Sequence, residues 1–256
     1  MTARWRGLIV ALGLLAVAAP AAARHGTAEF DARRTTPGLH LTLVERPAQL
    51  GSPGPVTYRL TVAGAPRGVL FGIWTKAFGE PFQRIASGFR LTETGALEAV
   101  DDAGRPRRLE DVVLEPGAYP HGAVWEVALV SADNALVAIA RATPRPIAAS
   151  SGPCAVSLEL ASRRGDRFLV TTRGFAQGET VSVRLDEAGR TTTRQRSIPP
   201  EGRLPLDVIT HHEGPSAERR ARYTVTGPSC AVAVDYTWGE PVPATLPTSA
   251  RSDTRP

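Results

Sequence analysis

Residues 173–183, RGFAQGETVSV, decide between two kinds of fold. Gly174 and Gly178 stand four positions apart, Glu179 follows, and a β-branched run comes next. A phosphate-binding loop needs a helix after its glycines, because the amides of the helix N-terminus bind the anion. Here apolar residues occupy every second position of residues 181–185, so a strand follows instead. The stretch therefore predicts a tight turn between two strands, in which the glycines supply positive φ angles.

Apolar and polar residues alternate with period two through much of the chain. The clearest stretches are VTYRLTV (56–62), AVSLEL (155–160), TVSVRL (180–185) and CAVAVDYTW (230–238). Strict alternation is typical of antiparallel strands with one buried and one solvated face. Helix signals are nearly absent, and short strands between Gly, Pro and Asp turns are typical of sandwiches and barrels. The sequence therefore predicts an all-β fold.

The strand–turn–strand unit occurs twice. The segment YRLTVAGAPRGVLFGIW (58–74) aligns with FLVTTRGFAQGETVSVRL (168–185) at an offset of 110 positions, and both copies have two glycines four positions apart. Val69 is the counterpart of Glu179, so the turn does not require an acid. The repeat indicates that the glycines serve the architecture and that the chain contains two similar units.

The second unit resembles a known type of module. The stretch GFAQGETVSVRL, followed by EGRLPLDV and RYTVTG, is similar to bacterial immunoglobulin-like modules in which a GF-x-x-GE-x-V turn joins two strands. The resemblance covers most of residues 150–239 and, more weakly, residues 39–148. It implies two tandem immunoglobulin-like antiparallel β-sandwich domains. The whole chain also resembles secreted bacterial proteins of unassigned activity, and the resemblance supplies no catalytic residues.

The first 23 residues have the pattern of a secretory signal peptide. Arg4 and Arg6 precede the apolar stretch GLIVALGLLAVAA and the small-residue end APAAA, which predicts cleavage after Ala23. The apolar stretch is shorter than the roughly 20 residues that a membrane span requires, and an uncleaved anchor is the alternative. We therefore expect an exported protein, periplasmic or extracellular, with no membrane span after signal removal.

The other boundaries follow from composition and from the repeat. Residues 24–38 have no periodicity and are expected to form a flexible lead. Residues 39–148 are predicted to form the first β-sandwich domain, and residues 149–239 the second. Residues 240–256 are a Pro-, Thr- and Ser-rich tail without a strand pattern and are expected to be disordered.

The charge of the chain argues against a nucleic-acid partner. Signal removal lowers the formal net charge from +5 to +3, because Arg4 and Arg6 leave and no acidic residue does. Lys76 is the only lysine, and the arginines are scattered along the chain in pairs. Nucleic-acid-binding proteins gather their basic residues on one face. No nucleic-acid partner is therefore expected.

Cys154 and Cys230 are the two cysteines of the chain. An even pair in an exported protein is normally a disulfide. Each cysteine opens a predicted strand after the same kind of turn, at the first and last strands of the second unit. A metal site is the alternative, but neither cysteine has a second cysteine or a histidine at ligand spacing. We therefore predict a disulfide between them.

Catalytic and metal-binding patterns were sought without success. None of the five histidines stands in an H-E-x-x-H pattern, and the chain has no G-x-S-x-G elbow. His211 and His212 precede Glu213, but a third metal ligand is not evident. The acidic pairs 101–102 and 110–111 alternate with arginines in a stretch of turn composition. We therefore expect no catalytic residues, no metal and no cofactor.

Trp74, Phe78 and Phe82 are the candidate binding surface. They recur every four positions in GIWTKAFGEPFQ (72–83), where a glycine and a proline argue against a helix. The rings are therefore expected at a strand end and in the loop beyond it. Exposed aromatic faces suit sugar rings and protein partners. The alternative is that the three rings cover the open end of the core.

These observations lead us to expect a non-catalytic binding or structural module of the bacterial cell envelope, with an envelope protein or a glycan as its partner. One alternative is a carbohydrate-binding module. Another is a two-domain periplasmic chaperone of the immunoglobulin-like type, which would offer an edge strand beside an arginine–lysine pair. Lys76 lies in a loop-like stretch, which argues against the chaperone.

Overall fold

The computed structural model describes residues 27–28, 35–46, 56–101, 104–117, 119–199, 207–211, 219–240 and 249–252. These residues form antiparallel β-sheets, which confirms the all-β prediction. The predicted signal peptide, residues 1–23, lies outside the described residues. Within the described part of the chain, no helix is long and apolar enough to cross a membrane.

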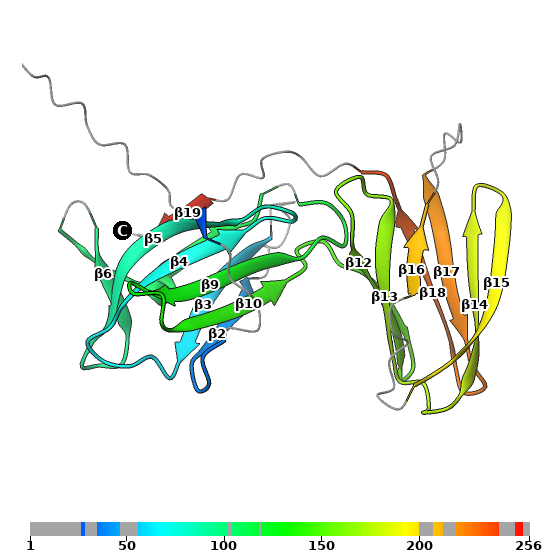
Figure 1. The fold of residues 1–256 in the computed structure, drawn as a ribbon, viewed down its shortest axis with the longest axis horizontal. Helices are drawn as coiled ribbons and strands as arrows, with labels where there is room; N and C mark the ends of the chain where they lie inside the picture. The colour runs from blue at the N-terminus through cyan, green and yellow to red at the C-terminus, as the bar shows by residue number, and fades with distance from the viewer. Residues whose placement is uncertain are drawn as a thin grey trace, which may run out of the picture.

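The N-terminal half contains one seven-stranded and one four-stranded sheet (Figure 1). The larger sheet has the order β10 (Val137–Ala142), β9 (Trp125–Ser131), β4 (Leu70–Lys76), β5 (Phe82–Leu91), β6 (Leu97–Val100) and β7 (Pro106–Arg108), with β1 (Thr27–Ala28) also paired to β5. The smaller sheet has the order β19 (Ser249–Ser252), β8 (Val112–Glu115), β3 (Thr57–Ala63) and β2 (His40–Arg46). A turn of 3-10 helix, Leu109–Asp111, precedes β8.

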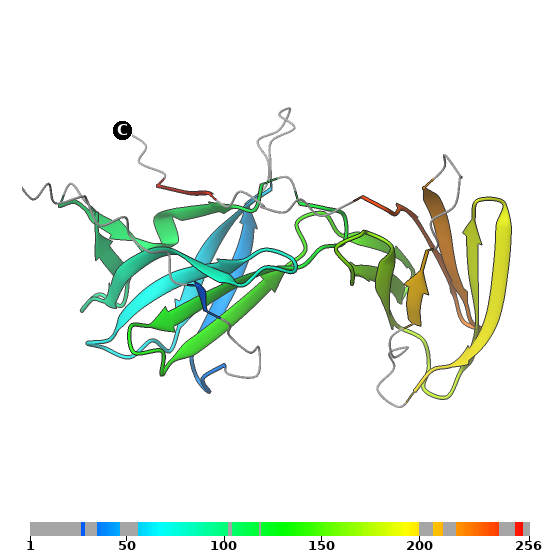
Figure 2. The same ribbon diagram turned by 45° about the horizontal axis from the view of Figure 1, so that its top comes forward.

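The C-terminal half contains two four-stranded sheets. One has the order β11 (Ile147–Ser151), β12 (Cys154–Leu160), β13 (Arg167–Arg173) and β16 (Asp207–Thr210). The other has the order β15 (Arg190–Ser197), β14 (Thr180–Glu187), β17 (Arg220–Thr226) and β18 (Ala231–Thr237). Figures 1 and 2 show these two sheets beside the N-terminal sheets along the long axis of the molecule.

The alternation read from the sequence matches the burial of the strands. In β18, Val232, Val234 and Tyr236 are buried, whereas the residues between them are exposed. Side chains of this kind from both sheets of the C-terminal half meet in its core, and the inward residues of the N-terminal sheets join the same apolar cluster. The hydrophobic effect on these alternating side chains therefore fixes which face of each strand points inward.

The disulfide between Cys154 and Cys230 is present, as predicted. Cys154 is the first residue of β12, and Cys230 directly precedes β18. These two strands belong to different sheets of the C-terminal half. The bond therefore links the two sheets covalently at one end.

Both predicted glycine turns connect strands. Gly64 and Gly68 lie between β3 and β4, Gly174 and Gly178 lie between β13 and β14, and all four have positive φ angles. A Cβ atom on Gly64 would collide with the backbone carbonyl of Gly38, and one on Gly174 would collide with that of Pro153. Glycine is thus required at the first position of each turn for two reasons: its φ angle is positive, and a second backbone segment approaches it closely.

The two halves contact each other directly. The Leu160 amide in β12 donates a hydrogen bond to the carbonyl of Gly122 at 2.8 Å. A Cβ atom on Gly122 would lie 3.0 Å from the carbonyl oxygen of Leu158, so this loop of the N-terminal half approaches β12 closely. Arg163 of the C-terminal half contacts the carboxylate of Glu80 at 2.6 Å. Backbone contact and charge pairing together set the junction.

Two short strands occur where the sequence pattern predicted none. Residues 27–28, in the expected flexible lead, pair with β5, and residues 249–252, in the expected disordered tail, pair with β8. Backbone pairing at a sheet edge needs no side-chain pattern, because every strand offers the same amide and carbonyl groups. Periodicity therefore does not reveal such strands.

Candidate functional site

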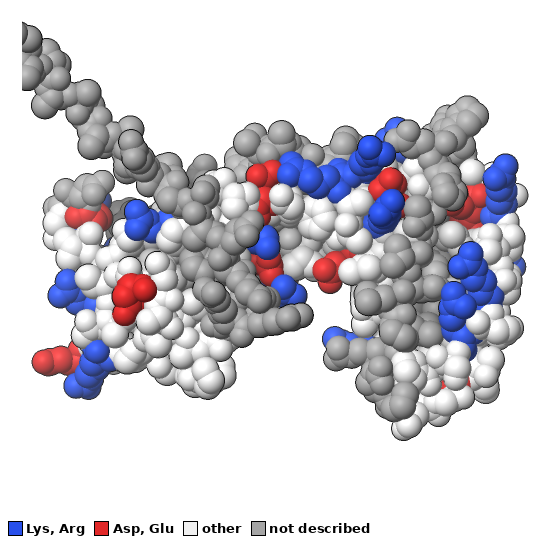
Figure 3. Space-filling view, viewed as in Figure 1, with Lys and Arg blue, Asp and Glu red and all other residues white. Residues whose placement is uncertain are grey.

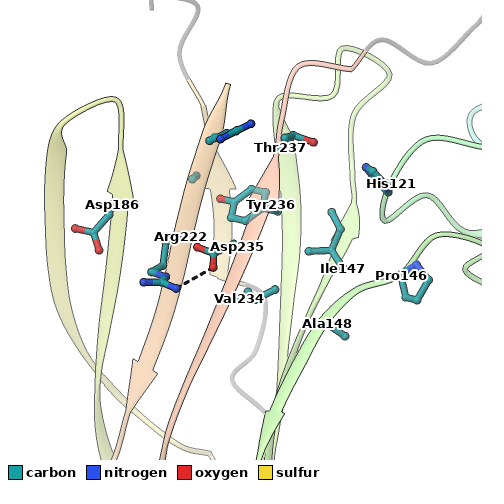
Figure 4. A pocket seen from close by; sticks show the side chains of 12 residues that line it. His121, Pro146, Ile147, Ala148, Asp186, Arg222, Val234, Asp235, Tyr236 and Thr237 are labelled. Carbon is teal, nitrogen blue, oxygen red and sulfur yellow. Dashed lines mark hydrogen bonds and ion pairs between the residues drawn. The ribbon is translucent and has the colours of Figure 1, made fainter. Parts of the chain in front are cut away.

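A groove of about 670 Å³ lies where the two halves meet (Figure 4). Residues of β11, β17 and β18 line it together with Asp186 of β14, His121 of the N-terminal half and Pro146. The order of the sheets makes β11 and β18 the last strands of their respective sheets. We call this site the junction groove. It combines two sheet margins with a loop from the other half of the chain.

A row of alternating charges crosses the sheet at the junction groove. Asp186, Arg222 and Asp235 stand directly opposite one another on three neighbouring strands. Arg222 Nη2 lies 2.8 Å from Asp235 Oδ2, the pair marked in Figure 4. Hydrogen bonds from Arg184 and then from Thr191 lower the pKa of Asp186, so this carboxyl stays ionised at neutral pH. The groove therefore presents fixed charges of both signs.

A histidine reaches the groove from the N-terminal half. His121 Nδ1 lies 3.8 Å from Glu240 Oε2, and Arg145 Nη1 lies 3.6 Å from the other oxygen of that carboxylate. Burial lowers the pKa of His121, and Arg145 lowers it further, whereas Glu240 opposes the shift. His121 is therefore neutral at pH 7 and can accept or donate a hydrogen bond to a bound group.

A buried polar network lies beneath the groove. His211 Nε2 is 2.8 Å from the hydroxyl of Tyr236, and His211 Nδ1 is 2.7 Å from Glu187 Oε1. The His211 ring also stacks on Trp238, with ring centroids 4.7 Å apart. Burial, and then the charge of Glu187, raise the pKa of Tyr236. His211 is only 2 % exposed, and its contact with the Tyr236 hydroxyl holds that side chain in place.

The three predicted binding-surface residues do not form one exposed surface. Trp74 and Phe82 belong to a small apolar cluster with Ala128, Val130 and Val137, separate from the main core. Trp74 is 9 % exposed and Phe82 is 1 % exposed. The guanidinium of Arg84 lies over the Trp74 ring, and the ammonium of Lys76 lies over Phe82. Of the two interpretations of the sequence, burial therefore holds for Trp74 and Phe82.

Phe78 lies apart from the other two rings. It is half-buried against the main core, and its amide donates a hydrogen bond to the hydroxyl of Tyr119 at 2.9 Å. The loop that contains Phe78 also contains Glu80, which contacts Arg163 at the junction. A binding role for Trp74, Phe78 and Phe82 stays a prediction, and the structure gives Phe78 a place near the contact between the halves.

Among the described residues, no group of three or more His, Cys, Asp or Glu side chains is arranged to hold a metal ion. His211 points at Tyr236 and Glu187, and its neighbours His212 and Glu213 lie outside the described residues. Asp101 instead contacts Arg105 within its own turn at 2.9 Å. The acidic stretch thus pairs internally here, as the composition of a solvated hairpin suggests.

The residues of the junction groove were not identified from the sequence. Alternation places Arg222 and Asp235 on the outward face of their strands, but it does not say that the two stand opposite each other. His121 and Glu240 come from distant segments, and only the packing of the two halves brings them together. A search for charged residues at alternate, outward positions of the last two strands would have found part of the row.

Searches against protein-family models, curated proteins and solved structures found no match to this chain.

Proposed function

We propose that the protein is an exported, non-catalytic binding module of the cell envelope, built from two immunoglobulin-like sandwiches, and that it binds an extended segment of an envelope protein in the junction groove. The combination of a groove, fixed charges of both signs and two sheet margins at one place carries this proposal.

The topology of the C-terminal half supports the immunoglobulin-like assignment. Its chain forms β12 and β13 in one sheet, β14 and β15 in the other, returns to the first sheet for β16 and ends in the second with β17 and β18. Such crossing between two packed antiparallel sheets is typical of immunoglobulin-like sandwiches. The paired glycine turns support a second, related sandwich in the N-terminal half.

Export is supported by chemistry as well as by the predicted signal peptide. The bond between Cys154 and Cys230 requires an oxidising compartment to form and persist. The absence of a long apolar helix among the described residues is compatible with a chain released after signal removal.

The chemistry of the groove favours a peptide over a glycan. Within the described strands, β18 pairs only with β17, and residues 234–237 of β18 line the groove. An extended peptide can add to an edge strand through its backbone while its side chains meet the row of charges. Sugar rings stack on exposed aromatic faces, but Tyr236, the aromatic residue of the lining, is 6 % exposed. Figure 3 shows acidic and basic groups interspersed where the halves meet, as a mixed-charge partner requires.

The proposal is tested with immobilised full-length mature protein and an envelope extract. Asp235→Arg places a like charge beside Arg222, and we expect it to lower capture of the bound component at least tenfold. Glu93→Arg makes the same charge change at an exposed position outside the groove and serves as the matched control. Equal capture by wild type and the Asp235 variant would remove the groove from consideration.

A second measurement separates the classes of ligand. Protease treatment of the extract destroys the bound component if it is a protein and spares it if it is a glycan. Ala148→Trp, which fills the groove from the β11 side, should abolish binding of either kind while the protein remains folded by circular dichroism. Capture that survives protease treatment would exclude the peptide assignment, and undiminished capture by Ala148→Trp would exclude the groove.

A further inference from the structure

Strand β8 has more pairing with the end of the chain than with the rest of its sheet. It pairs with β3 at two positions, Tyr58 with Leu114 and Arg59 with Val113. It pairs with β19 at four positions, along its whole length of Val112–Glu115. Without β19, β8 would be the last strand of a three-stranded sheet. The tail of the chain therefore completes this sheet.

The edge of β8 that β19 covers belongs to a buried, apolar strand. Val112 and Leu114 are fully buried, and Val113 is 7 % exposed. A strand edge of this kind presents unpaired amide and carbonyl groups to any extended segment that reaches it. It is an acceptor site for a strand, and β19 is the donor that occupies it.

The donor arrives from the other half of the molecule. Strand β18 ends at Thr237, and Glu240 contacts His121 and Arg145 at the junction. From Glu240 the chain needs nine residue steps to reach Ser249, which span at most about 30 Å. Figure 1 shows β19 against the N-terminal sheets. Donor and acceptor are thus joined by one covalent connection, and every copy of the protein carries both.

We propose that the β8 edge is a strand-exchange site, and that its occupant in trans is the β19 segment of a second copy of this chain. In the exchanged pair each tail pairs with β8 of the other copy through the same four positions, which gives a closed two-fold assembly. No contact changes between the two forms except along the connection. The equilibrium between the monomer and the exchanged pair therefore depends on protein concentration. In the monomer, β19 has a fixed effective concentration at its own β8, whereas the concentration of β19 segments from other copies rises with that of the protein. This inference does not depend on the junction groove.

The test uses single cysteines in the full-length mature protein. The two natural cysteines are bonded to each other, so an introduced cysteine is the only free thiol of its chain. Ser249 stands opposite Glu115 in the register of β19 and β8. Glu115→Cys and Ser249→Cys chains, one of them carrying a size tag, are mixed and oxidised. A heterodimer between them requires that a tail reach the β8 of another copy.

We expect a disulfide-linked heterodimer whose share rises with protein concentration. The control replaces Glu115→Cys with Glu110→Cys, which is exposed but lies before β8, and it should give several-fold less heterodimer. A chain with both substitutions should close its bond within one molecule at low concentration. The proposal is overturned if the double variant closes internally while the mixed single variants give no heterodimer above the Glu110 control at any concentration.

The proposal is also overturned if neither the double variant nor the mixture forms a cross-link, because β19 would then not occupy β8. Ala250→Pro in the otherwise unchanged chain gives an independent measurement, since proline removes an amide from the donor strand. It should abolish the concentration-dependent increase in mass seen by light scattering. If the Ala250→Pro variant shows the same concentration-dependent increase in mass as the wild type, the association uses another surface.

Discussion

The turns at residues 64–68 and 174–178 have the same glycine spacing and positive φ angles but are held differently. The first turn packs on the backbone of Gly38. The second packs on Pro153, whose neighbour Cys154 is bonded to Cys230. In the second, Glu179 also accepts a hydrogen bond from the Ala176 amide at 2.7 Å. Backbone geometry therefore fixes the glycines, whereas the contacts that support each turn differ between the halves.

The disulfide is the largest of these differences. Replacing both Cys154 and Cys230 by alanine should lower the free energy of unfolding by about 4–5 kcal/mol, because the bond closes a long loop in the unfolded chain. Urea denaturation followed by circular dichroism measures the loss, and reduction of the wild type should reproduce it. Two free thiols in unfolded, unreduced wild-type protein would refute the bond itself.

The glycines provide a second test, with a control inside each turn. Gly64→Ala and Gly174→Ala combine an unfavourable φ angle with a backbone collision, and each should cost about 3 kcal/mol. A Cβ atom at Gly68 or Gly178 meets open space, so alanine there should cost only about 1 kcal/mol. Thermal unfolding of the four variants measures the pattern. Equal losses within one turn would show that the close approach of the second segment is not tight.

Tyr58 on β3 aligns with Phe168 on β13, so Tyr58→Phe makes the two copies alike at this position. Burial, and then Glu45, raise the pKa of Tyr58 to about 12, above its ordinary value of 10.0. The neutral phenol is thus favoured in the folded state. This contribution to stability is complete below pH 10 and is lost as the pH rises from 10 to about 12, because the unfolded chain ionises first.

Denaturant titrations at pH 8 and pH 11 measure this effect. The wild type should lose on the order of 1–2 kcal/mol more than Tyr58→Phe between the two values. The variant should still lose some stability, because burial also raises the pKa values of Tyr119 and Tyr236. Identical alkaline losses in the two proteins would mean that Tyr58 ionises as freely when folded as when unfolded.

Glu179→Val gives the second turn the residue that the first turn has, and its effect should be the smallest. The variant loses the hydrogen bond to the Ala176 amide, worth about 1 kcal/mol, and keeps the fold. Val69→Glu is the reciprocal control. It should not raise the free energy of unfolding, because the first turn forms with valine at this position. A loss above about 3 kcal/mol for Glu179→Val would show that the acid is essential to the second turn.

The parts of the structure that follow from local sequence could be predicted. Alternation gave the strands and their buried faces, and the glycine spacing gave both turns. The partners of Cys154 and Cys230 could be inferred because the chain has no other cysteine. The sequence left open whether Trp74 and Phe82 are exposed or part of the core, and the structure buries both in a small apolar cluster that the alternation of their strands did not reveal.

The junction groove depends on information that alternation does not contain. The position of Arg222 opposite Asp235 is set by the register of two strands, and that of His121 near Glu240 is set by the packing of the two halves. Strands β1 and β19 pair through their backbones, and no alternation of apolar residues predicts them from the sequence. Contacts between distant segments therefore account for most of what the sequence did not reveal.

The position of β19 also has a consequence for how the protein is made. The ribosome produces β8 long before it produces residues 249–252, so the N-terminal sheets remain one strand short until those residues emerge. Contacts between segments so far apart in sequence form slowly, and an uncovered strand edge is open to aggregation in the meantime. A nascent chain that stalls before residues 249–252 therefore keeps the β8 edge open.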